Sequence, residues 1–283
     1  MLLTRISPIR LPQIRSSRCS SGSFLAITER IGSSSCLHQP VPKCGTMRVA
    51  GIQPGYLPWL GYFDQMRRVD AFIVADEMQF TTSGWVHRNR VRGPHGAHWL
   101  TVPVHFSLGE PICQVRLSPH VPWADHHLEL LDHFYRRSPY RQLVLDTLER
   151  FLRKPAVKLV EITVPLLHQL RDWLGIQTPL LVSSELGLER IYEAMFPDKP
   201  SPTHRIIAFL RHLGATSLLQ GATAREYLDV ALCQRYGIEV TFHDYQHPEY
   251  PQLFSPFISH LSVVDLLLSC GIERAREVLS SVP

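Results

Sequence analysis

Residues 49–63 have the sequence VAGIQPGYLPWLGYF, and this stretch decides the fold. Its first four residues are small or apolar, as in a buried strand. Gln53-Pro54-Gly55 ends that strand, because proline cannot continue a ladder and glycine permits a tight turn. Pro58 suits the first turn of a helix, where its missing N–H costs nothing. The next apolar side chains share one helical face at three- and four-residue spacings: Trp59, Tyr62, Phe63 and Met66. The stretch predicts a strand, a tight turn and a helix.

This turn is the first candidate for a ligand site. It brings Gln53 and free backbone N–H groups to the carboxyl end of a strand, where open α/β sheets bind ligands. Tyr56 and Trp59 stand beside Gln53 and are candidate substrate contacts. The alternative is that the glycines, prolines and aromatics only shape and pack a βα corner.

Composition limits the class of protein. A chain of 283 residues with 45% hydrophobic content can bury a genuine core. The formal charge is +4, but six of the basic residues lie in the first 46 residues, so the remainder is close to neutral. A neutral body argues against duplex nucleic acid as the main partner. No run of about 18 apolar residues predicts a membrane span.

The six cysteines include no CxxC pair, and they fit neither a disulfide framework nor a zinc site. This usage predicts a reducing cytoplasm. No motif requires a metal or a cofactor, so the cofactor is left unknown. Residues 1–46 are rich in serine and arginine and have no sustained periodicity. We interpret them as a disordered leader or a mis-annotated start before Met47, in preference to a targeting peptide.

A second buried strand follows the first helix. Ala71-Phe72-Ile73-Val74-Ala75 is continuously apolar and ends in Asp76-Glu77, which completes a βαβ unit. Because neighbouring parallel strands place their carboxyl-end turns side by side, we expect Gln53 and Asp76 to converge. Asp76 is a candidate contact for substrate amine or hydroxyl groups, and a candidate catalytic residue.

Residues 79–90 mix hydroxyl groups, a tryptophan and two arginines in a predicted loop. Such a loop could hold an anionic substrate. The alternative is an ordinary solvated loop. Its candidate ligand contacts are Gln79, His87, Arg88, Asn89 and Arg90.

Residues 123–174 have a 3.6-residue apolar period that Pro139, Pro155 and Pro165 divide into three or four helices. We interpret this segment as a helical insertion in one α/β domain of residues 47–283. His126, His127 and His133 invite a metal interpretation, but no cysteine or acidic ligand completes a motif. A solvated helix face is the preferred interpretation.

The βα pattern returns near residue 216. A short strand leads to Gly221, and Thr223 with Glu226 resembles a capping box at the start of a helix over 227–236. A helix start of this kind beside Arg225 favours an anion. The alternative is that Arg225 pairs with a nearby acid. The candidate contacts here are Gly221, Thr223 and Arg225.

A polar aromatic loop, residues 244–252, follows the strand at 238–242. Its His247 is the preferred candidate for a general base, since an ordinary histidine pKa lies near neutrality. Asp244 and Tyr250 are candidate substrate contacts. The alternative is that His247 only hydrogen-bonds loop backbone. A last apolar helix is predicted over 262–269, ended by Gly271.

With these segments in place, the sequence resembles the WbqC-like protein family over Met47 to Gly271. Many members have His-Gln-Pro at the first turn, where this chain has Ile52-Gln53-Pro54. Four stretches carry the resemblance: residues 53–63, residues 76–90 with 99–104, residues 221–228, and residues 244–253.

The resemblance implies a bacterial, cytoplasmic protein of O-antigen or other surface polysaccharide biosynthesis. It favours a transferase that moves an acyl or aminoacyl group to an amino or nucleotide-linked sugar, with a nucleotide-sugar or an activated acyl donor as phosphate-bearing partner. A non-catalytic sugar-nucleotide-binding or assembly protein is the alternative. The chain also has a weaker likeness to pantothenate synthetase and related nucleotidyl transferases. Residues 55–58 lack the two histidines of the HIGH motif of those enzymes. The fold expected is α/β, with a Rossmann-like, mostly parallel sheet.

Overall fold

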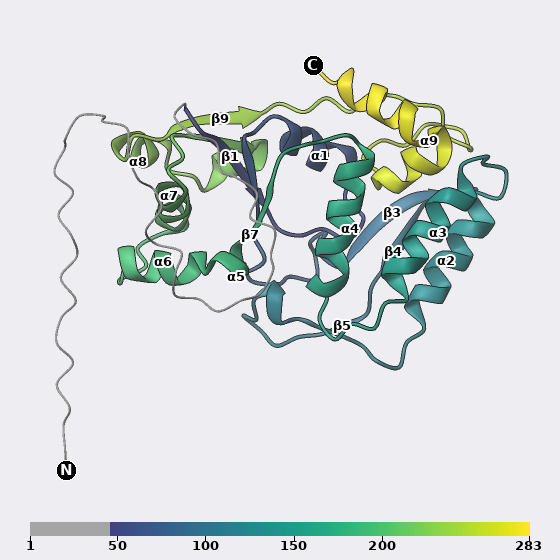
Figure 1. Ribbon diagram of the computed structural model, residues 1–283, viewed down its shortest axis with the longest axis horizontal. Helices are drawn as coiled ribbons and strands as arrows, with labels where there is room; N and C mark the ends of the chain where they lie inside the picture. Colours follow the sequence, from purple (N-terminus) through teal and green to yellow (C-terminus); the bar gives the residue numbers. More distant parts are fainter. Residues whose placement is uncertain (1–45) are drawn as a thin grey trace, which may run out of the picture. The chain divides into compact units, whose positions relative to one another are not determined.

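The computed structural model describes residues 46–283 (Figure 1). The expected leader therefore lies outside the described residues, apart from Thr46. Within residues 46–283, no helix combines the length and the apolar character that a membrane crossing demands. The three cysteines of this part of the chain, Cys113, Cys233 and Cys270, are free.

A five-stranded sheet forms the centre, and all its neighbouring strands are parallel. The strand order is β7-β2-β1-β8-β9. The chain therefore adds β2 and β7 on one side of β1 and then β8 and β9 on the other side. This is the doubly wound pattern of Rossmann-like folds, and it confirms the α/β prediction. The strands are β1 (Arg48–Ile52), β2 (Ala71–Val74), β7 (Leu180–Val182), β8 (Ser217–Gly221) and β9 (Glu239–His243).

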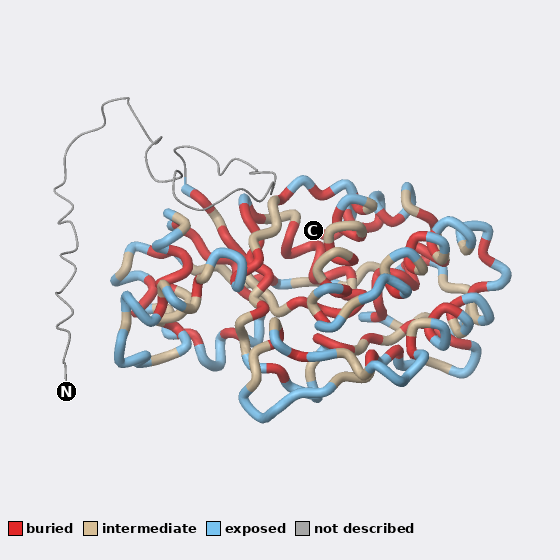
Figure 2. Tube along the Cα trace, turned by 60° about the horizontal axis from the view of Figure 1, so that its bottom comes forward, coloured by how far each residue is buried: buried red, intermediate tan, exposed pale blue. Residues whose placement is uncertain are grey.

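Helices cover both faces of the sheet, because successive strand residues point to opposite sides. Ala50 and Phe72 face one hydrophobic cluster, and Val49 and Ala71 face the other. The first cluster is built with α1 (Leu60–Arg67), α4 (Val160–Trp173) and α9 (Val263–Ser280). The second is built with α6 (Leu188–Met195) and α7 (Pro202–Leu213), followed by α8 (Val230–Arg235). Figure 2 shows the buried residues running along the strands between these helices.

Three helices occupy the segment that the 3.6-residue period marked. They are α2 (Trp123–Phe134), α3 (Arg141–Leu152) and α4, which contains Pro165. Their apolar stripe packs into the first cluster, for example through Leu131 and Leu148. The solvated-face interpretation is wrong for His127, which is 3% exposed and lies on the buried side of α2.

An antiparallel hairpin of β3 (Arg88–Gly93) and β4 (Gly96–Thr101) takes the last three residues of the predicted loop, 88–90. Placing Arg88, Asn89 and Arg90 in a loop was therefore wrong. Charged residues hid the alternation, but Asn89 and Val91 are buried while Arg90 between them is half-buried. A smaller pair, β5 (Val104–His105) and β6 (Arg116–Leu117), follows with the 3₁₀ turn η1 (Ile112–Gln114).

Two expected helix ends differ in the structure. Residues Ala222–Glu226 form a 3₁₀ turn (η2), and α8 begins only after Asp229, whose carboxylate accepts from the Leu232 N–H at 2.8 Å. The capping box at Thr223 was wrong because Asp229 supplies the N-cap instead. At the other place, α9 continues past Gly271, which has a φ of 81°. Gly271 interrupts the helical conformation as predicted, but a further helical segment follows it within α9, and the ring of Tyr140 packs against the glycine.

Candidate functional site

The sheet opens between β1 and β8. These strands pair only at their amino ends, Arg48 with Ser217 and Val49 with Leu218, whereas β1 and β2 pair over four positions. The same place is where the strand order reverses. In open α/β sheets, the crevice outside the strand ends at such a switch point is the usual ligand site.

Gln65 fills part of this opening. Its side chain is 3% exposed and donates from Nε2 to the main-chain oxygen of Leu219 at 3.0 Å. The Leu219 oxygen, which β1 does not reach, thereby accepts a hydrogen bond from a side chain of α1. The two strands can separate without leaving a buried carbonyl unpaired.

A cavity of about 540 Å³ occupies the split and extends to the carboxyl ends of β1 and β8. This volume suits a small organic ligand. Apolar side chains from α7, including Ile206 and Phe209, form one wall. The lining side chains with polar or aromatic groups are Gln53, Trp59, Tyr62, Gln65, Arg205, Gln220, Thr223 and Tyr227.

Tyr62 provides a hydrogen-bonding group in this lining. The residue is 3% exposed, and its hydroxyl has no partner among the described residues. Burial raises the pKa of Tyr62 above its ordinary value, so the hydroxyl keeps its proton at neutral pH. The hydroxyl therefore cannot serve as a base, and its oxygen is itself closed off from solvent.

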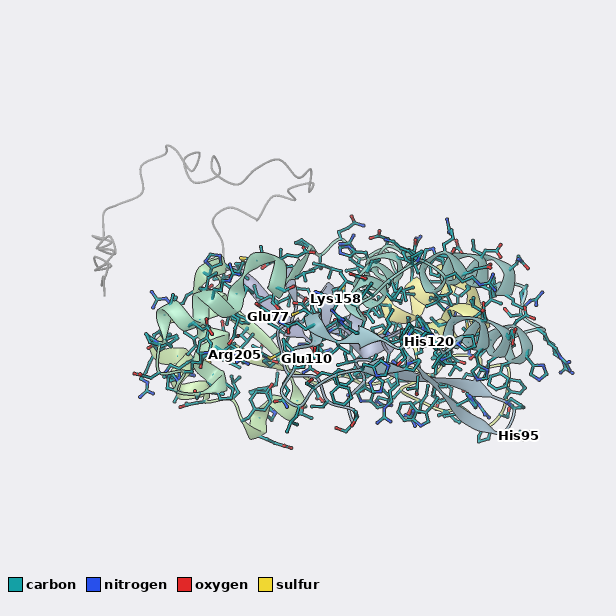
Figure 3. All side chains as sticks on the ribbon, turned by 90° about the horizontal axis from the view of Figure 1, so that it is seen from below. Glu77, His95, Glu110, His120, Lys158 and Arg205 are labelled. Atoms are coloured by element: carbon teal, nitrogen blue, oxygen red, sulfur yellow. The ribbon has the colours of Figure 1, made fainter. Side chains whose placement is uncertain are left out.

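Arg205 is the cation of the cavity. Its guanidinium donates to Glu189 Oε1 at 3.0 Å and lies over the ring of Tyr192, 5.3 Å from the centroid. Its Nε is buried without a partner among residues 46–283. Figure 3 shows Arg205 near Glu77, whose carboxylate accepts from the Glu189 N–H at 3.2 Å. The Nη1 of Arg205 also donates to Met78 Sδ at 3.9 Å, and the Arg205 side chain is 31% exposed, so the outer N–H groups of the guanidinium are the ones that a ligand can reach.

Trp59 forms the wall between the cavity and a group of aromatic side chains. Its ring lies against Gly61, where an added Cβ would come within 2.4 Å of the ring, so only glycine fits. Its centroid is 4.9 Å from that of Tyr245 and 5.2 Å from that of His260. His260 in turn stacks on His247 at 4.7 Å.

Four of the residues predicted from the sequence line the cavity. They are Gln53, Trp59, Gly221 and Thr223. They come from the ends of β1 and β8, as the βα pattern predicted for a ligand crevice. Their contact with a ligand remains a prediction.

Two other candidates, Tyr56 of the first turn and Asn89 of β3, are buried and have protein partners. Tyr56 Oη hydrogen-bonds His127 Nδ1 at 2.9 Å. Asn89 donates from Nδ2 to the oxygen of Leu57 at 2.8 Å, and Leu57 has a φ of 48°. A non-glycine residue in that region is unfavourable unless its surroundings hold it. These contacts fix the turn that carries Gln53.

Asp76 lies outside the cavity lining. It is 1% exposed, and its carboxylate accepts from Ser183 Oγ at 2.8 Å, from the Ser184 N–H at 2.9 Å and from Ser184 Oγ at 2.5 Å. The expected convergence of Gln53 and Asp76 on one ligand was wrong, because the start of α5 (Ser183–Leu186), directly after β7, takes up the carboxylate.

The Gly221 corner has no α-helix N-terminus to bind an anion, since its turn is 3₁₀. The guanidinium of Arg225 lies over the Phe242 ring, 4.0 Å from the centroid, on an exposed surface. The physical basis for an anion site at Arg225 is therefore absent from the described residues.

The candidates near β3 lie in different environments. Gln79 is exposed. His87 is 7% exposed, and burial, followed by the charge of Arg88, lowers its pKa. Arg88 and Arg90 lie beside two exposed tryptophans, outside the cavity lining.

His247 also lies outside the cavity lining. Its Nδ1 is 3.0 Å from Tyr245 Oη, and its Nε2 accepts from the His260 N–H at 3.4 Å. Burial, followed by the charge of His260, lowers the pKa of His247 to about 4. The ring is neutral at pH 7 and a weak base in this state.

The other two loop candidates are also outside the cavity lining. Tyr250 donates to Asp265 Oδ2 at 2.8 Å and, with Gln252, ties the loop to α9. Asp244 is exposed beside a smaller cavity of about 350 Å³ that includes His243 and Arg68.

Sequence reasoning missed Tyr62, Gln65, Arg205 and Gln220. Tyr62 sat in an apolar helical stripe, which is the pattern of a core residue. A glutamine at position 65, on the same helix, was the available signal, because a polar residue inside a buried helix needs a partner. Gln220 lies at the carboxyl end of a strand, as Gln53 does, so its position could have marked it as a candidate too.

Comparisons with known proteins agree with the sequence resemblance. A family model described as the WbqC-like protein family matches residues 53–277. An "uncharacterized protein Rv1507c" of Mycobacterium tuberculosis is 32% identical over 230 residues, which cover 80% of this chain and 95% of the relative. No solved structure matches the chain.

Proposed function

The chain belongs to the WbqC-like protein family, and from this premise we propose that it binds a phosphate-bearing sugar derivative, such as a nucleotide-linked sugar, in the switch-point cavity. The proposed setting is the synthesis of a bacterial surface polysaccharide, as the sequence resemblance implies.

The observation that carries this proposal is the composition of the cavity. Of the described residues that line it, Arg205 is the cation, and there is no histidine, carboxylate or thiol among them. An uncompensated carboxylate would repel a phosphate, whereas a guanidinium with free N–H groups attracts one. Apolar walls from α7 suit a base or a sugar ring.

Polar groups across the cavity would read the rest of the ligand. The amides of Gln53 and Gln220 offer both donors and acceptors. Sugars carry hydroxyl and acylamino groups that need both kinds of partner. This arrangement supports recognition more directly than acid–base chemistry.

Group transfer to the bound sugar is the second candidate function. The observation in its favour is the position of His247, which stacks on His260, the ring that contacts Trp59 of the cavity wall. In this proposal the sugar amine attacks the acyl carbon of an activated donor, a C–N bond forms as the bond from that carbon to the donor's phosphate leaving group breaks, the phosphate leaves as an anion, and His247 takes the amine proton. The Nε2 of His247 would have to leave the His260 N–H first.

Calorimetric titration with UDP-, GDP- and dTDP-linked sugars tests the binding proposal. We expect saturable binding of at least one, and Arg205→Ala to weaken it about 10- to 100-fold, the range for a hydrogen bond to a charged group. Arg211→Ala is the matched control, because Arg211 is an exposed arginine of the same helix outside the cavity lining. Absence of binding by all three classes, or equal affinities of the two variants, contradicts the proposal.

A further inference from the structure

Two exposed tryptophans form a stacked pair, Trp85 just before β3 and Trp99 within β4. The rings of Trp85 and Trp99 have centroids 5.2 Å apart and planes inclined by 27°. Trp85 is 45% exposed and Trp99 42% exposed, so a substantial apolar area of both residues faces solvent. Large exposed aromatic surfaces that stay together mark interaction sites more often than single exposed residues do.

Two guanidinium groups lie over the same rings. Arg88 is 4.5 Å from the Trp99 centroid, and Arg90 is 5.5 Å from that of Trp85 and 5.6 Å from that of Trp99. Arg88 is also held by the carbonyl oxygens of Ser83 and Gly84. Among residues 46–283, neither arginine has a carboxylate partner within salt-bridge distance. The pair of rings therefore carries two cations that remain available to an anionic ligand.

We propose that Trp85, Trp99, Arg88 and Arg90 form a binding surface for an acidic glycan. A pyranose ring has an apolar C–H face that can pack on an indole, and its hydroxyl groups stay in water at the edge. A uronic-acid carboxylate can pair with a guanidinium through two parallel N–H···O bonds. This combination of flat apolar surface and isolated cations matches a sugar chain with occasional negative charges.

The charge balance of the described residues favours a glycan over a single-stranded nucleic acid. The chain has 29 Lys and Arg and 25 Asp and Glu, of which six and one lie in residues 1–45. The described residues therefore have 23 basic and 24 acidic side chains. A nucleic acid carries a charge at each nucleotide and needs a continuous basic groove, which a balanced surface does not provide.

The surface is fixed to the same turn that supports the cavity. The Trp85 oxygen accepts from the Tyr56 N–H at 3.3 Å, and the Arg90 oxygen accepts from the Ser262 N–H at 2.8 Å. Burial lowers the pKa of His260, the residue stacked on Trp59, and the positive charge of Arg90 lowers it further. The glycan surface thus lies next to the cavity wall. The inference does not depend on what the cavity binds.

Binding of defined hexasaccharides to the purified full chain tests the proposal. The probes are hexasaccharides in which glucuronate or galacturonate alternates with neutral sugars, with maltohexaose as a neutral probe and a dT decamer as a nucleic-acid probe. We expect at least one acidic hexamer to bind more tightly than maltohexaose and the decamer, and Trp85→Ala to weaken it at least 10-fold. Leu108→Ala is the control, since this side chain is 97% exposed and lies outside the tryptophan pair.

Arg88→Gln is the second variant, and it tests the proposal even if Trp85→Ala does not fold. Its expected effect is at least a five-fold weaker affinity for the acidic hexamer with an unchanged melting temperature, because Arg88 contacts only loop carbonyls and the Trp99 face. The proposal is overturned if no acidic hexamer binds, if Arg88→Gln binds as wild type, or if the decamer binds most tightly.

Discussion

The side chain of Gln65 donates a hydrogen bond to the main-chain oxygen of Leu219, 154 residues away, at the point where β1 leaves β8. Through this contact the buried Leu219 oxygen keeps a hydrogen-bond donor although β1 and β8 have separated around the cavity. It joins a helix of the first βα unit to a strand of the second half of the chain.

Gln65→Ala should lower the free energy of unfolding by about 1–3 kcal/mol, because it leaves the buried Leu219 oxygen without a donor. Urea denaturation measures the difference. Gln142→Ala is the matched control, since Gln142 is an exposed helical glutamine, and its effect should stay within about 0.5 kcal/mol. Equal unfolding midpoints for the two variants would show that Leu219 finds another donor, such as water.

Tyr62→Phe should leave the protein as stable as wild type or more stable, because it removes a buried hydroxyl that has no partner in the described chain. Tyr56→Phe is the contrasting variant. It removes the hydroxyl that hydrogen-bonds His127, and it should cost about 0.5–1.5 kcal/mol. Thermal unfolding of both variants checks this, and a larger loss in Tyr62→Phe would mean that its hydroxyl already has a partner.

Asp76→Ala should lower the free energy of unfolding by about 1.5–3 kcal/mol, since the carboxylate accepts three hydrogen bonds from Ser183 and Ser184. Asp146→Ala, at an exposed position of α3, is the control for loss of an acid. Chemical denaturation separates the two. If Asp76→Ala is as stable as wild type but binds the ligand more weakly, Asp76 is again a functional candidate.

Stability should fall as the pH drops from 6.5 toward 4, in part through His127. Burial, followed by the charge of His126, lowers the pKa of His127 to about 4, and an unfolded histidine titrates near 6.5. Between these values the unfolded chain binds the extra proton, so acid favours unfolding. From pH 7 to pH 5 this one group accounts for about 2 kcal/mol.

His127→Gln tests this origin, because glutamine can still hydrogen-bond Tyr56 but does not titrate. Urea unfolding at pH 7 and pH 5 should show a smaller loss in the variant than in wild type. His133→Gln, at an exposed histidine of the same helix, should leave the pH dependence unchanged. Identical pH dependence in wild type and His127→Gln would contradict the assignment.

Local patterns were sufficient for the central sheet and most helices. The apolar run 71–75, the Gln53-Pro54-Gly55 stop and the strand at 238–242 depend on a few neighbouring residues, so they are readable in the sequence. Strand β3 and the Thr223 corner were misread for a related reason. Burial of β3 against the core overrode its charged composition, and a second cap at Asp229 competed with Thr223.

The sequence by itself determined that this chain is an α/β protein with a candidate ligand turn at Gln53, because strand and helix periods and turn residues are local properties. Only the tertiary structure decided which side chains share the cavity. Asp76 and His247 ended outside its lining, while Tyr62 and Arg205 entered it, from helices whose patterns resemble ordinary core and surface. The physical reason is that the cavity forms where β1 and β8 separate, and contacts across a chain distance of more than 100 residues leave no periodic trace in either segment.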